Sequence, residues 1–372
     1  MIVDCSLSCP VIKTPRLMQL LGIFDVPPTE RSENHFKIEL PIEQFDWNIG
    51  LIIGPSGSGK TTVARNGFGP KLHISFNWPQ DKSLVDGFPT NLAIKEITGL
   101  LSSVGFSSPP SWLRPFRCLS TGEQFRATLA RALAESPELA VIDEFTSVID
   151  RQVAQIGSAA VAKSVRRSGR KLIAVSCHFD IVDWLDPDWI LEMPQGVFTR
   201  RSLRQRPEIE LEIMRTDKTA WPIFKNYHYL NTSLAPGAIC FVGVIFNRPA
   251  AFTAVMHFPT TAGGCWREHR TVCLPDFQGV GIGNALSEFV ASLFLATGKH
   301  YISITGNPAM IAHRNRSRNW KLTRKPSLST WKLSTSGLAQ NFSKTGASNR
   351  LTASFRYVGP VRHTEAKIHG II

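Results

Sequence analysis

A glycine-rich loop that ends in lysine and threonine is the first stretch whose residue types could do chemistry. The segment GPSGSGKTT, residues 54–62, has the spacing GxxxxGK[ST] and follows the apolar run 49–53. Glycines at such a turn let several backbone N–H groups converge on phosphate oxygens at a helix N-terminus. The spacing predicts a nucleoside triphosphate site, with a glycine-rich turn and a chance lysine as the alternative. The predicted binding residues are Gly54, Ser56, Gly57, Gly59, Lys60, Thr61 and Thr62.

Two acids close the apolar segment LAVIDE, residues 139–144, and could complete the chemistry of phosphate hydrolysis. Asp143 would hold Mg²⁺ through water, together with Thr61, and Glu144 would polarise the attacking water. Lys60 would reach the β- and γ-phosphates. A buried strand that happens to end in a surface acid pair is the alternative.

Between these elements lies LSTGEQ, residues 119–124, which resembles the LSGGQ signature of ABC-type ATPases. Thr121 stands in place of a glycine and Glu123 in place of a glutamine. The resemblance implies that Ser120 and Gly122 face a γ-phosphate at the start of the helix that follows. In this family ATP is sandwiched between two domains that meet head to tail, so a homodimer using ATP and Mg²⁺ is implied.

Further segments resemble ABC elements in the family's order. Residues 147–150 resemble the D-loop, His178 resembles the switch histidine, and Gln80 resembles the Q-loop glutamine, which contacts nucleotide and metal. The resemblance therefore implies Glu144, His178 and Lys60 as catalytic residues and Thr61, Asp143 and Gln80 around the metal. Phe36 and Trp47 are the candidates for the A-loop aromatic residue.

A second glycine loop, QGVGIG at residues 278–283, stands between a predicted strand at 270–274 and an amphipathic helix. It looks like the acyl-CoA pyrophosphate loop of GNAT-type acetyltransferases, and the resemblance implies acetyl-CoA or another acyl-CoA as a cofactor. A Rossmann loop is the competitor, but no strand ends in an acid some twenty residues later. An inert turn is the other alternative. The implied binding residues are Gln278, Gly279, Gly281 and Gly283.

The whole chain resembles a family of ABC-type ATPases fused to a predicted acetyltransferase domain. The second half also resembles, more loosely, phage enzymes of the GNAT-like fold that are thought to modify DNA bases. A GNAT enzyme commonly needs a general base near the split between its central strands. The candidates by type and position are Glu268, His269, His228 and Tyr229.

Charge divides the chain into two unlike halves. Residues 1–199 hold 19 Lys and Arg against 21 Asp and Glu, whereas residues 200–372 hold 23 against 8. So basic a half is expected to attract a polyanion, nucleic acid above all, unless it is only a solvated surface. A basic cluster around Trp320 suggests phosphate contacts with base stacking. Its members are Arg314, Arg316, Arg318 and Lys321.

The elements that would position these residues predict an α/β fold. The resemblances imply a P-loop ABC-type domain at 1–205 and an α+β GNAT-like domain at 206–372. Residues 1–33 are expected to be an N-terminal packing element, and residues near 325–349 a mobile segment. A membrane span and a secretory signal are not encoded, and the seven cysteines lack a CxxC pair, so a cytoplasmic protein is expected.

These observations favour a soluble ATPase whose ATP cycle gates a GNAT-like transferase that acts on nucleic acid or another polyanion. Two alternatives stay open. One is the ATP-binding subunit of an ABC transporter, and the other is an ATP-gated DNA clamp without acyl transfer.

Overall fold

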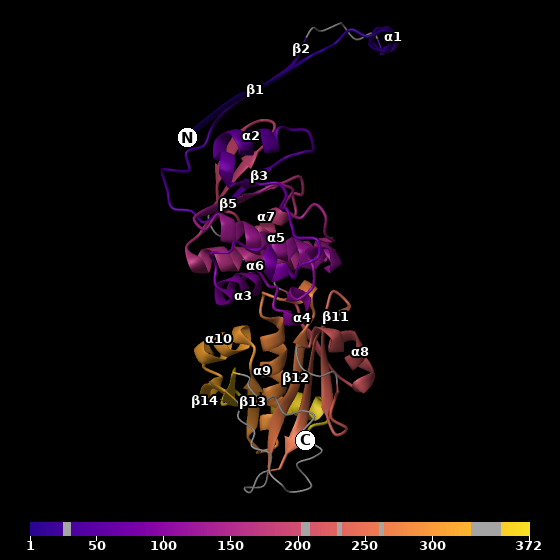
Figure 1. The fold of residues 1–372 in the computed structure, drawn as a ribbon. Helices are drawn as coiled ribbons and strands as arrows, with labels where there is room; N and C mark the ends of the chain where they lie inside the picture. Colours follow the sequence, from indigo (N-terminus) through magenta and orange to yellow (C-terminus); the bar gives the residue numbers. More distant parts are fainter. Residues whose placement is uncertain (25–30, 202–208, 229–232, 260–263, 329–350) are drawn as a thin grey trace. The chain divides into compact units, whose positions relative to one another are not determined.

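A computed structural model describes residues 1–372 except 25–30, 202–208, 229–232, 260–263 and 329–350 (Figure 1). The chain divides into two compact units. The first unit contains Met1–Asn77, Ala132–Val148 and Ser164–Arg206, and the second unit contains Trp78–Arg131, Ile149–Lys163 and Pro207–Ile372. The predicted boundary at 205/206 and most of the predicted mobile segment 325–349 lie outside the described residues.

The first unit is built on a six-stranded sheet in which every neighbouring pair is parallel except the last, β7 with β8. All five residues of the central strand β3 are buried, as expected for a parallel strand covered on both faces. The strands in spatial order are β4 (Leu72–His73), β5 (Leu139–Ile142), β6 (Lys171–Ser176), β3 (Ile49–Ile53), β7 (Trp189–Glu192) and β8 (Val197–Arg200). Helices α2 (Lys60–Phe68) and α7 (Ile181–Leu185) belong to this unit.

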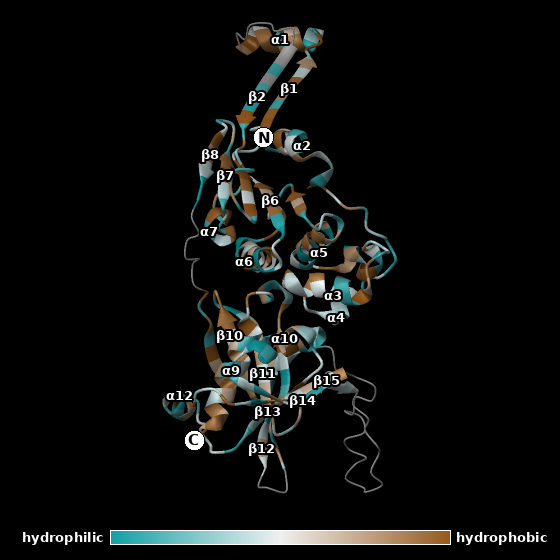
Figure 2. Cartoon of the chain, turned by 90° about the vertical axis from the view of Figure 1, so that its left-hand side faces the viewer, coloured by the Kyte–Doolittle hydropathy of each residue, from teal (hydrophilic) through white to brown (hydrophobic). Residues whose placement is uncertain are grey.

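A two-stranded antiparallel ribbon begins the first unit (Figures 1 and 2). It consists of β1 (Ile2–Pro10) and β2 (Arg31–Glu39), with α1 (Pro15–Phe24) between them. Val3 and Cys5 of β1 are buried in the core, whereas no residue of α1 is buried and most of its apolar side chains are exposed. Within the predicted packing element, therefore, the strand packs and the helix does not.

The second unit contains a seven-stranded sheet and the helices around the signature segment. The strands in spatial order are β14 (Trp320–Leu328), β15 (Leu351–Tyr357), β13 (Tyr301–Thr305), β12 (Cys265–Cys273), β11 (Arg248–Phe258), β10 (Ile239–Ile245) and β9 (Glu212–Thr216). The helices that lie wholly in this unit are α3 (Ile94–Ser103), α4 (Pro109–Trp112), α8 (Trp221–Phe224), α9 (Ile282–Leu295), α10 (Pro308–Arg316) and α12 (His363–Ile368). Helices α5 (Thr121–Glu135) and α6 (Arg151–Ser168) give their first parts to it.

One parallel pair, β12 with β13, interrupts an otherwise antiparallel sheet. The pair is held at only two positions, Trp266 with Tyr301 and Arg267 with Ile302. Helix α9 connects the two strands and buries Leu286 and Phe294 in the core of this sheet. The structure thus places the polar residues that follow Arg267 on β12 beyond the last paired position with β13.

Strands β10 and β11 form an antiparallel hairpin. Its turn residues, Phe246 and Asn247, have φ angles of 53° and 58°, as a two-residue hairpin turn of the primed type requires. In the described part of the chain, no helix is long and apolar enough to cross a membrane.

Candidate active site

The predicted phosphate loop lies between the buried strand β3 and helix α2. Gly57 and Gly59 have φ angles of 78° and 90°, in the left-handed region where glycine is free of strain. The Lys60 Nζ donates a hydrogen bond to the Pro55 carbonyl (2.7 Å), so the lysine side chain folds over its own loop. The strand, loop and helix that the motif predicts are therefore all present.

Because β3, β5 and β6 are parallel, their carboxyl ends meet at one edge of the sheet, where ligands of such sheets bind. Asp143 and Glu144 follow β5, and His178 follows β6. Two hydrogen bonds tie these strand ends together. The Phe145 N–H donates to the Val175 carbonyl, and the Ser176 Oγ donates to the Phe145 carbonyl, each at 2.9 Å.

The predicted hydrolytic residues have distinct surroundings at this edge. Asp143 is buried, whereas Glu144 is exposed, adopts a φ of 50° and accepts a hydrogen bond from Ser147 Oγ (2.5 Å). The His178 Nδ1 is buried and has no hydrogen-bond partner among the described residues. A buried polar atom without a partner is costly, so this imidazole suits a ligand that completes its hydrogen bonding.

Two oxygen ligands of the kind that Mg²⁺ prefers stand at the same edge, the Thr61 hydroxyl on α2 and the Asp143 carboxylate after β5. Magnesium sites of nucleotide enzymes commonly combine one or two such protein ligands with substrate phosphates and water. The residues present therefore fit a Mg²⁺ ion that a bound nucleotide completes.

The two aromatic candidates for the A-loop differ in the structure. Trp47 is buried, donates its indole N–H to the Ile42 carbonyl (3.0 Å) and packs edge-on against Trp189. Phe36 is half-buried on β2, and its ring would lie 2.4 Å from a Cβ added to Gly59 of the phosphate loop. Trp47 is therefore a core residue, and Phe36 is the candidate that touches the loop.

The signature segment forms the N-terminus of α5. The Glu123 N–H donates to Ser120 Oγ (3.3 Å), and the Ser120 N–H donates to Glu123 Oε2 (3.0 Å), which together form a capping box. The departure from glutamine at position 123 thus has a local structural role. The sequence signal for this cap is the pattern S-x-x-E at residues 120–123.

Two further residues of the ABC-like elements, Gln80 and Asp150, belong to the second unit. Gln80 is exposed, and its carbonyl accepts a hydrogen bond from Arg117 Nε (3.0 Å). Asp150, at the end of the D-loop-like segment, caps α6 by accepting from the Gln152 and Val153 N–H groups. The nucleotide and metal roles of Gln80, Ser120 and Gly122 stay predictions.

Known ATP-binding proteins are similar to this chain. The zinc import ATP-binding protein ZnuC of Chromohalobacter salexigens is 31% identical over 136 residues, which are 31% of this chain and 55% of that protein. The aliphatic sulfonates import ATP-binding protein SsuB 2 of Frankia alni is 27% identical over 208 residues, 49% of this chain and 80% of that protein. The chain spans about half the length of several zinc import proteins that it matches.

With the motifs in the family's order, these relatives decide the class of the first half. The chain carries an ABC-type ATPase domain. No protein-family model matches the chain. Among solved structures, the dimeric ATP-binding cassette MJ0796 bound to ADP and Pi is similar at 17% identity and a TM-score of 0.37, over 46% of this chain and 94% of that chain.

Outside the ATPase motifs, the glycine loop of the second half is only partly open. The Gln278 side chain donates to the Cys273 carbonyl (2.7 Å) and accepts from the Ser107 N–H. Gly279 is exposed, but a Cβ there would lie 2.7 Å from the Cα of Gly105. Gly281 has a φ of 107°, precedes α9, and has no described atom within 4 Å of an added Cβ. Of these two glycines, only Gly281 therefore leaves open space beside its Cα.

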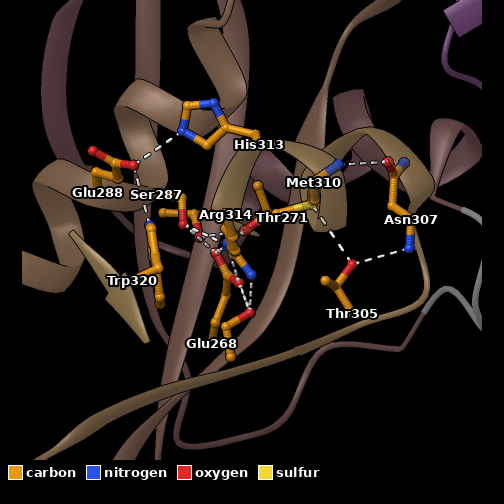
Figure 3. Close-up of polar contacts among 12 residues, drawn as sticks. Glu268, Thr271, Ser287, Glu288, Thr305, Asn307, Met310, His313, Arg314 and Trp320 are labelled. Atoms are coloured by element: carbon orange, nitrogen blue, oxygen red, sulfur yellow. Dashed lines mark hydrogen bonds and ion pairs between the residues drawn. The ribbon is translucent and has the colours of Figure 1, made fainter. Parts of the chain in front are cut away.

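Glu268, a candidate general base, lies just beyond the last paired position of β12 and β13 and is buried in a polar cluster (Figure 3). It accepts hydrogen bonds from Arg314 Nη2 (2.8 Å), Ser287 Oγ (2.6 Å), Thr271 Oγ1 (2.8 Å) and Ser303 Oγ. Burial raises the pKa of Glu268, but the Arg314 charge and these hydroxyl donors outweigh it and hold the pKa below its usual value. A carboxylate engaged by four donors is poorly placed to take a substrate proton.

The prediction of a nucleic-acid cluster is wrong for Arg314 and for Trp320, the residue that the cluster surrounds. The Arg314 side chain is 1% exposed because it forms the ion pair with Glu268. Trp320 is buried under the Arg314 guanidinium and donates its indole N–H to Glu288 Oε1 (3.1 Å), so it cannot stack on a base (Figure 3). Arg316, Arg318 and Lys321 are exposed.

The histidine candidates are also engaged. His269 Nε2 accepts a hydrogen bond from the Ala235 N–H (3.1 Å). Burial, together with the neighbouring charges of Arg270 and Arg267, lowers the pKa of His269 to about 3. His228 is buried and packs edge-on against Trp221. Tyr229 lies outside the described residues. A general base for the second half stays unassigned.

Proposed function

We propose that this chain hydrolyses ATP as a homodimer and that its second half is a GNAT-like transferase that uses acetyl-CoA or another acyl-CoA. Glu144 would accept the proton of the attacking water. Lys60 and His178 would stabilise the negative charge that develops on the γ-phosphate oxygens. The convergence of these residues at the carboxyl edge of the first unit's sheet supports this half of the proposal.

The observation that carries the transferase reading is the parallel pair β12 and β13, which is paired at two positions only. The glycine loop and the N-terminus of the 14-residue helix α9 follow directly after β12 and its short 3₁₀ turn. The order agrees with the split between central strands that the GNAT resemblance implies. The antiparallel neighbour β11 argues against the Rossmann alternative, whose sheet is mostly parallel.

Gly281 and Gly283 give this loop its fit to a pyrophosphate. Gly281 leaves open space in front of the first amides of α9, and backbone N–H groups at a helix N-terminus favour an anion. The thioester of a bound acyl-CoA would supply the acyl group for transfer. The side chain of Gln278 and the close backbone approach at Gly279 serve the packing of the loop, so the binding role would fall on residues 280–283.

For the acceptor we propose a polyanion, with nucleic acid as the class to test first. The surplus of Lys and Arg in residues 200–372 supports it, as do the exposed Arg316, Arg318 and Lys321. The names of the similar import proteins favour a second candidate, an ATP-binding subunit of an ABC transporter. Co-purification with an integral membrane partner would support that candidate.

A pair of glycine variants tests the acyl-CoA site. Gly281 and Gly298 both have positive φ angles, 107° and 76°, and an added Cβ meets no described atom within 4 Å at either one. An alanine is strained at both positions, and more so at Gly281, whose φ lies farther from the left-handed helical region. Only Gly281, however, stands at the N-terminus of α9, where its Cβ would occupy the approach to the amides.

We expect Gly281→Ala to weaken acetyl-CoA binding at least about tenfold by calorimetry, a loss of about 1.4 kcal/mol. Gly298→Ala should stay within about twofold of the parent. Equal effects of the two variants, or no acetyl-CoA binding by the parent chain, would reject the acyl-CoA reading.

A further inference from the structure

Arg126, four residues after Gly122 on α5, is fully buried and points at the glycine loop of the second half. Its Nη2 donates to the Asp276 carbonyl (2.7 Å), and its Nη1 donates to the Gln278 carbonyl (3.0 Å). The same Nη1 lies 3.2 Å from the Val104 carbonyl and 3.3 Å from the Gly105 carbonyl. All of these residues belong to the second compact unit.

The charge of Arg126 makes this contact specific. Burying a cation is costly unless it is paired or hydrogen-bonded. Here its partners among the described residues are backbone carbonyls, two from the segment before α4 and two from the glycine-loop segment. Burial lowers the pKa of Arg126 to about 10, so the side chain keeps its charge at neutral pH. A shift of residues 276–278 away from α5 would therefore leave a buried cation short of acceptors.

Close backbone approaches reinforce the hydrogen bonds. Gly105 and Gly279 lie so near each other that a Cβ on either would meet the other's backbone or its neighbour's at under 3.0 Å. On the signature itself, a Cβ at Gly122 would lie 2.7 Å from a carboxylate oxygen of Asp276. The contact between the signature segment and the loop thus has little room to slide.

We propose that Arg126 is a positioning residue that couples the ATP-binding signature of the ATPase domain to the glycine loop of the second half. ATP bound against Ser120 and Gly122 displaces the start of α5, and Arg126 transmits that displacement to residues 276–283. Ligand binding at the loop acts on ATP binding in return, because linkage between two sites is reciprocal. The identity of the ligand, an acyl-CoA, rests on the proposed function, whereas the coupling rests on the contacts of Arg126.

The test measures a coupling factor rather than an activity. The full chain carrying Glu144→Gln is titrated with Mg-ATP in the absence and presence of acetyl-CoA, and with acetyl-CoA in the absence and presence of Mg-ATP. Each ligand is expected to change the other's Kd by the same factor, at least about fivefold. In Arg126→Lys, which keeps the charge but loses the fork of donors, the factor should fall toward one while each separate Kd stays within about threefold.

Arg131→Lys is the matched control. Arg131 lies on the same helix and stacks on the Trp78 ring at 4.6 Å, and it should keep the parental coupling factor. A purely structural role of Arg126 would instead weaken each separate affinity and leave the factor unchanged, and that result would overturn the proposal.

Hydrogen exchange distinguishes failure of the proposed acyl-CoA function from failure of the proposed coupling. Adding Mg-ATP to the Glu144→Gln chain should change the exchange of peptides covering residues 275–283 at least about fivefold, even if acetyl-CoA does not bind. The absence of acetyl-CoA binding together with this change would remove the proposed function and keep the coupling. An acetyl-CoA-binding chain in which ATP leaves residues 275–283 unchanged, and in which the coupling factor is one, would overturn the coupling. This measurement needs no Arg126 variant, so it decides the question even if Arg126→Lys does not fold.

Discussion

Replacing Arg314 with leucine is expected to destabilise the sheet of the second unit by about 3–5 kcal/mol. The substitution leaves Glu268 buried with three hydroxyl donors but without its counterion. Removing one partner of a buried ion pair costs far more than the pair contributes net, because the remaining charge stays desolvated. Arg316→Leu is the matched control. Arg316 lies on the same helix but is exposed, so its loss should stay within about 0.5 kcal/mol.

The loss of this counterion also predicts the direction in which the stability of Arg314→Leu changes with pH. In the parent chain, the pKa of Glu268 lies below its unfolded value, so its stabilising contribution is full above the unfolded pKa and is lost only as the pH falls through the folded pKa. In Arg314→Leu, burial is no longer opposed by a cation, and the pKa of Glu268 rises above the unfolded value. The variant should then regain stability as the pH falls from 7.5 to 5, by up to about 1.4 kcal/mol per pH unit.

Native-state hydrogen exchange of the peptides that contain β12 and β13 measures this local stability. The exchange rates are corrected for the intrinsic effect of pH. The double variant Glu268→Gln/Arg314→Leu should recover part of the loss and show no upward trend toward acid. A loss below about 1 kcal/mol in Arg314→Leu, or stability that falls from pH 7.5 to 5 as a result of this substitution, would refute the assignment of a buried, charged pair.

Two other variants test the chemistry and the partner. Glu144→Gln should lower the ATP hydrolysis rate at least about a hundredfold while ATP binding is kept, because an amide cannot accept the proton of water; hydrolysis at the parental rate would remove Glu144 from its role. Arg316→Ala with Arg318→Ala should weaken binding of duplex DNA and lower the slope of log Kd against log salt by about 2. Unchanged affinity and slope, measured by fluorescence anisotropy at several salt concentrations, would leave these exposed arginines as a solvated surface.

The strand, loop and helix around residues 54–62 could be predicted from the sequence because the motif depends on local backbone geometry. The loop at Gly57 and Gly59 needs positive φ angles, and the acids after β5 need a buried strand before them. Both requirements can be recognised from residues that are neighbours in the sequence. The N-cap of α5 is equally local, because Ser120 and Glu123, which form it, are only three residues apart.

The second half shows what a local pattern cannot reveal. Arg314 sits in the basic stretch 314–321, and nothing beside it marks it as buried, since its partner Glu268 is 46 residues away. The strand predicted at 270–274 begins already at Cys265, because β12 pairs with β11 from that residue onward. The run WREHR, residues 266–270, is unusually charged for a buried strand, and the ion pair of Glu268 with Arg314 compensates the buried charge of the glutamate. Arg126, which meets a loop about 150 residues later, was unpredictable for the same reason.

The charges around the start of α5 supply the free-energy difference that coupling requires. Glu123 already places a carboxylate at this helix N-terminus, and Asp276 brings a second one against Gly122. Burial raises the pKa of Asp276, and the nearby Arg126 acts in the opposite direction. A γ-phosphate that approaches the same N-terminus meets these negative groups, so ATP should favour a position in which Asp276 has moved away. Because Arg126 holds the backbone of Asp276, that movement cannot occur without moving the glycine loop, and a ligand that prefers one loop position then selects one state of the signature.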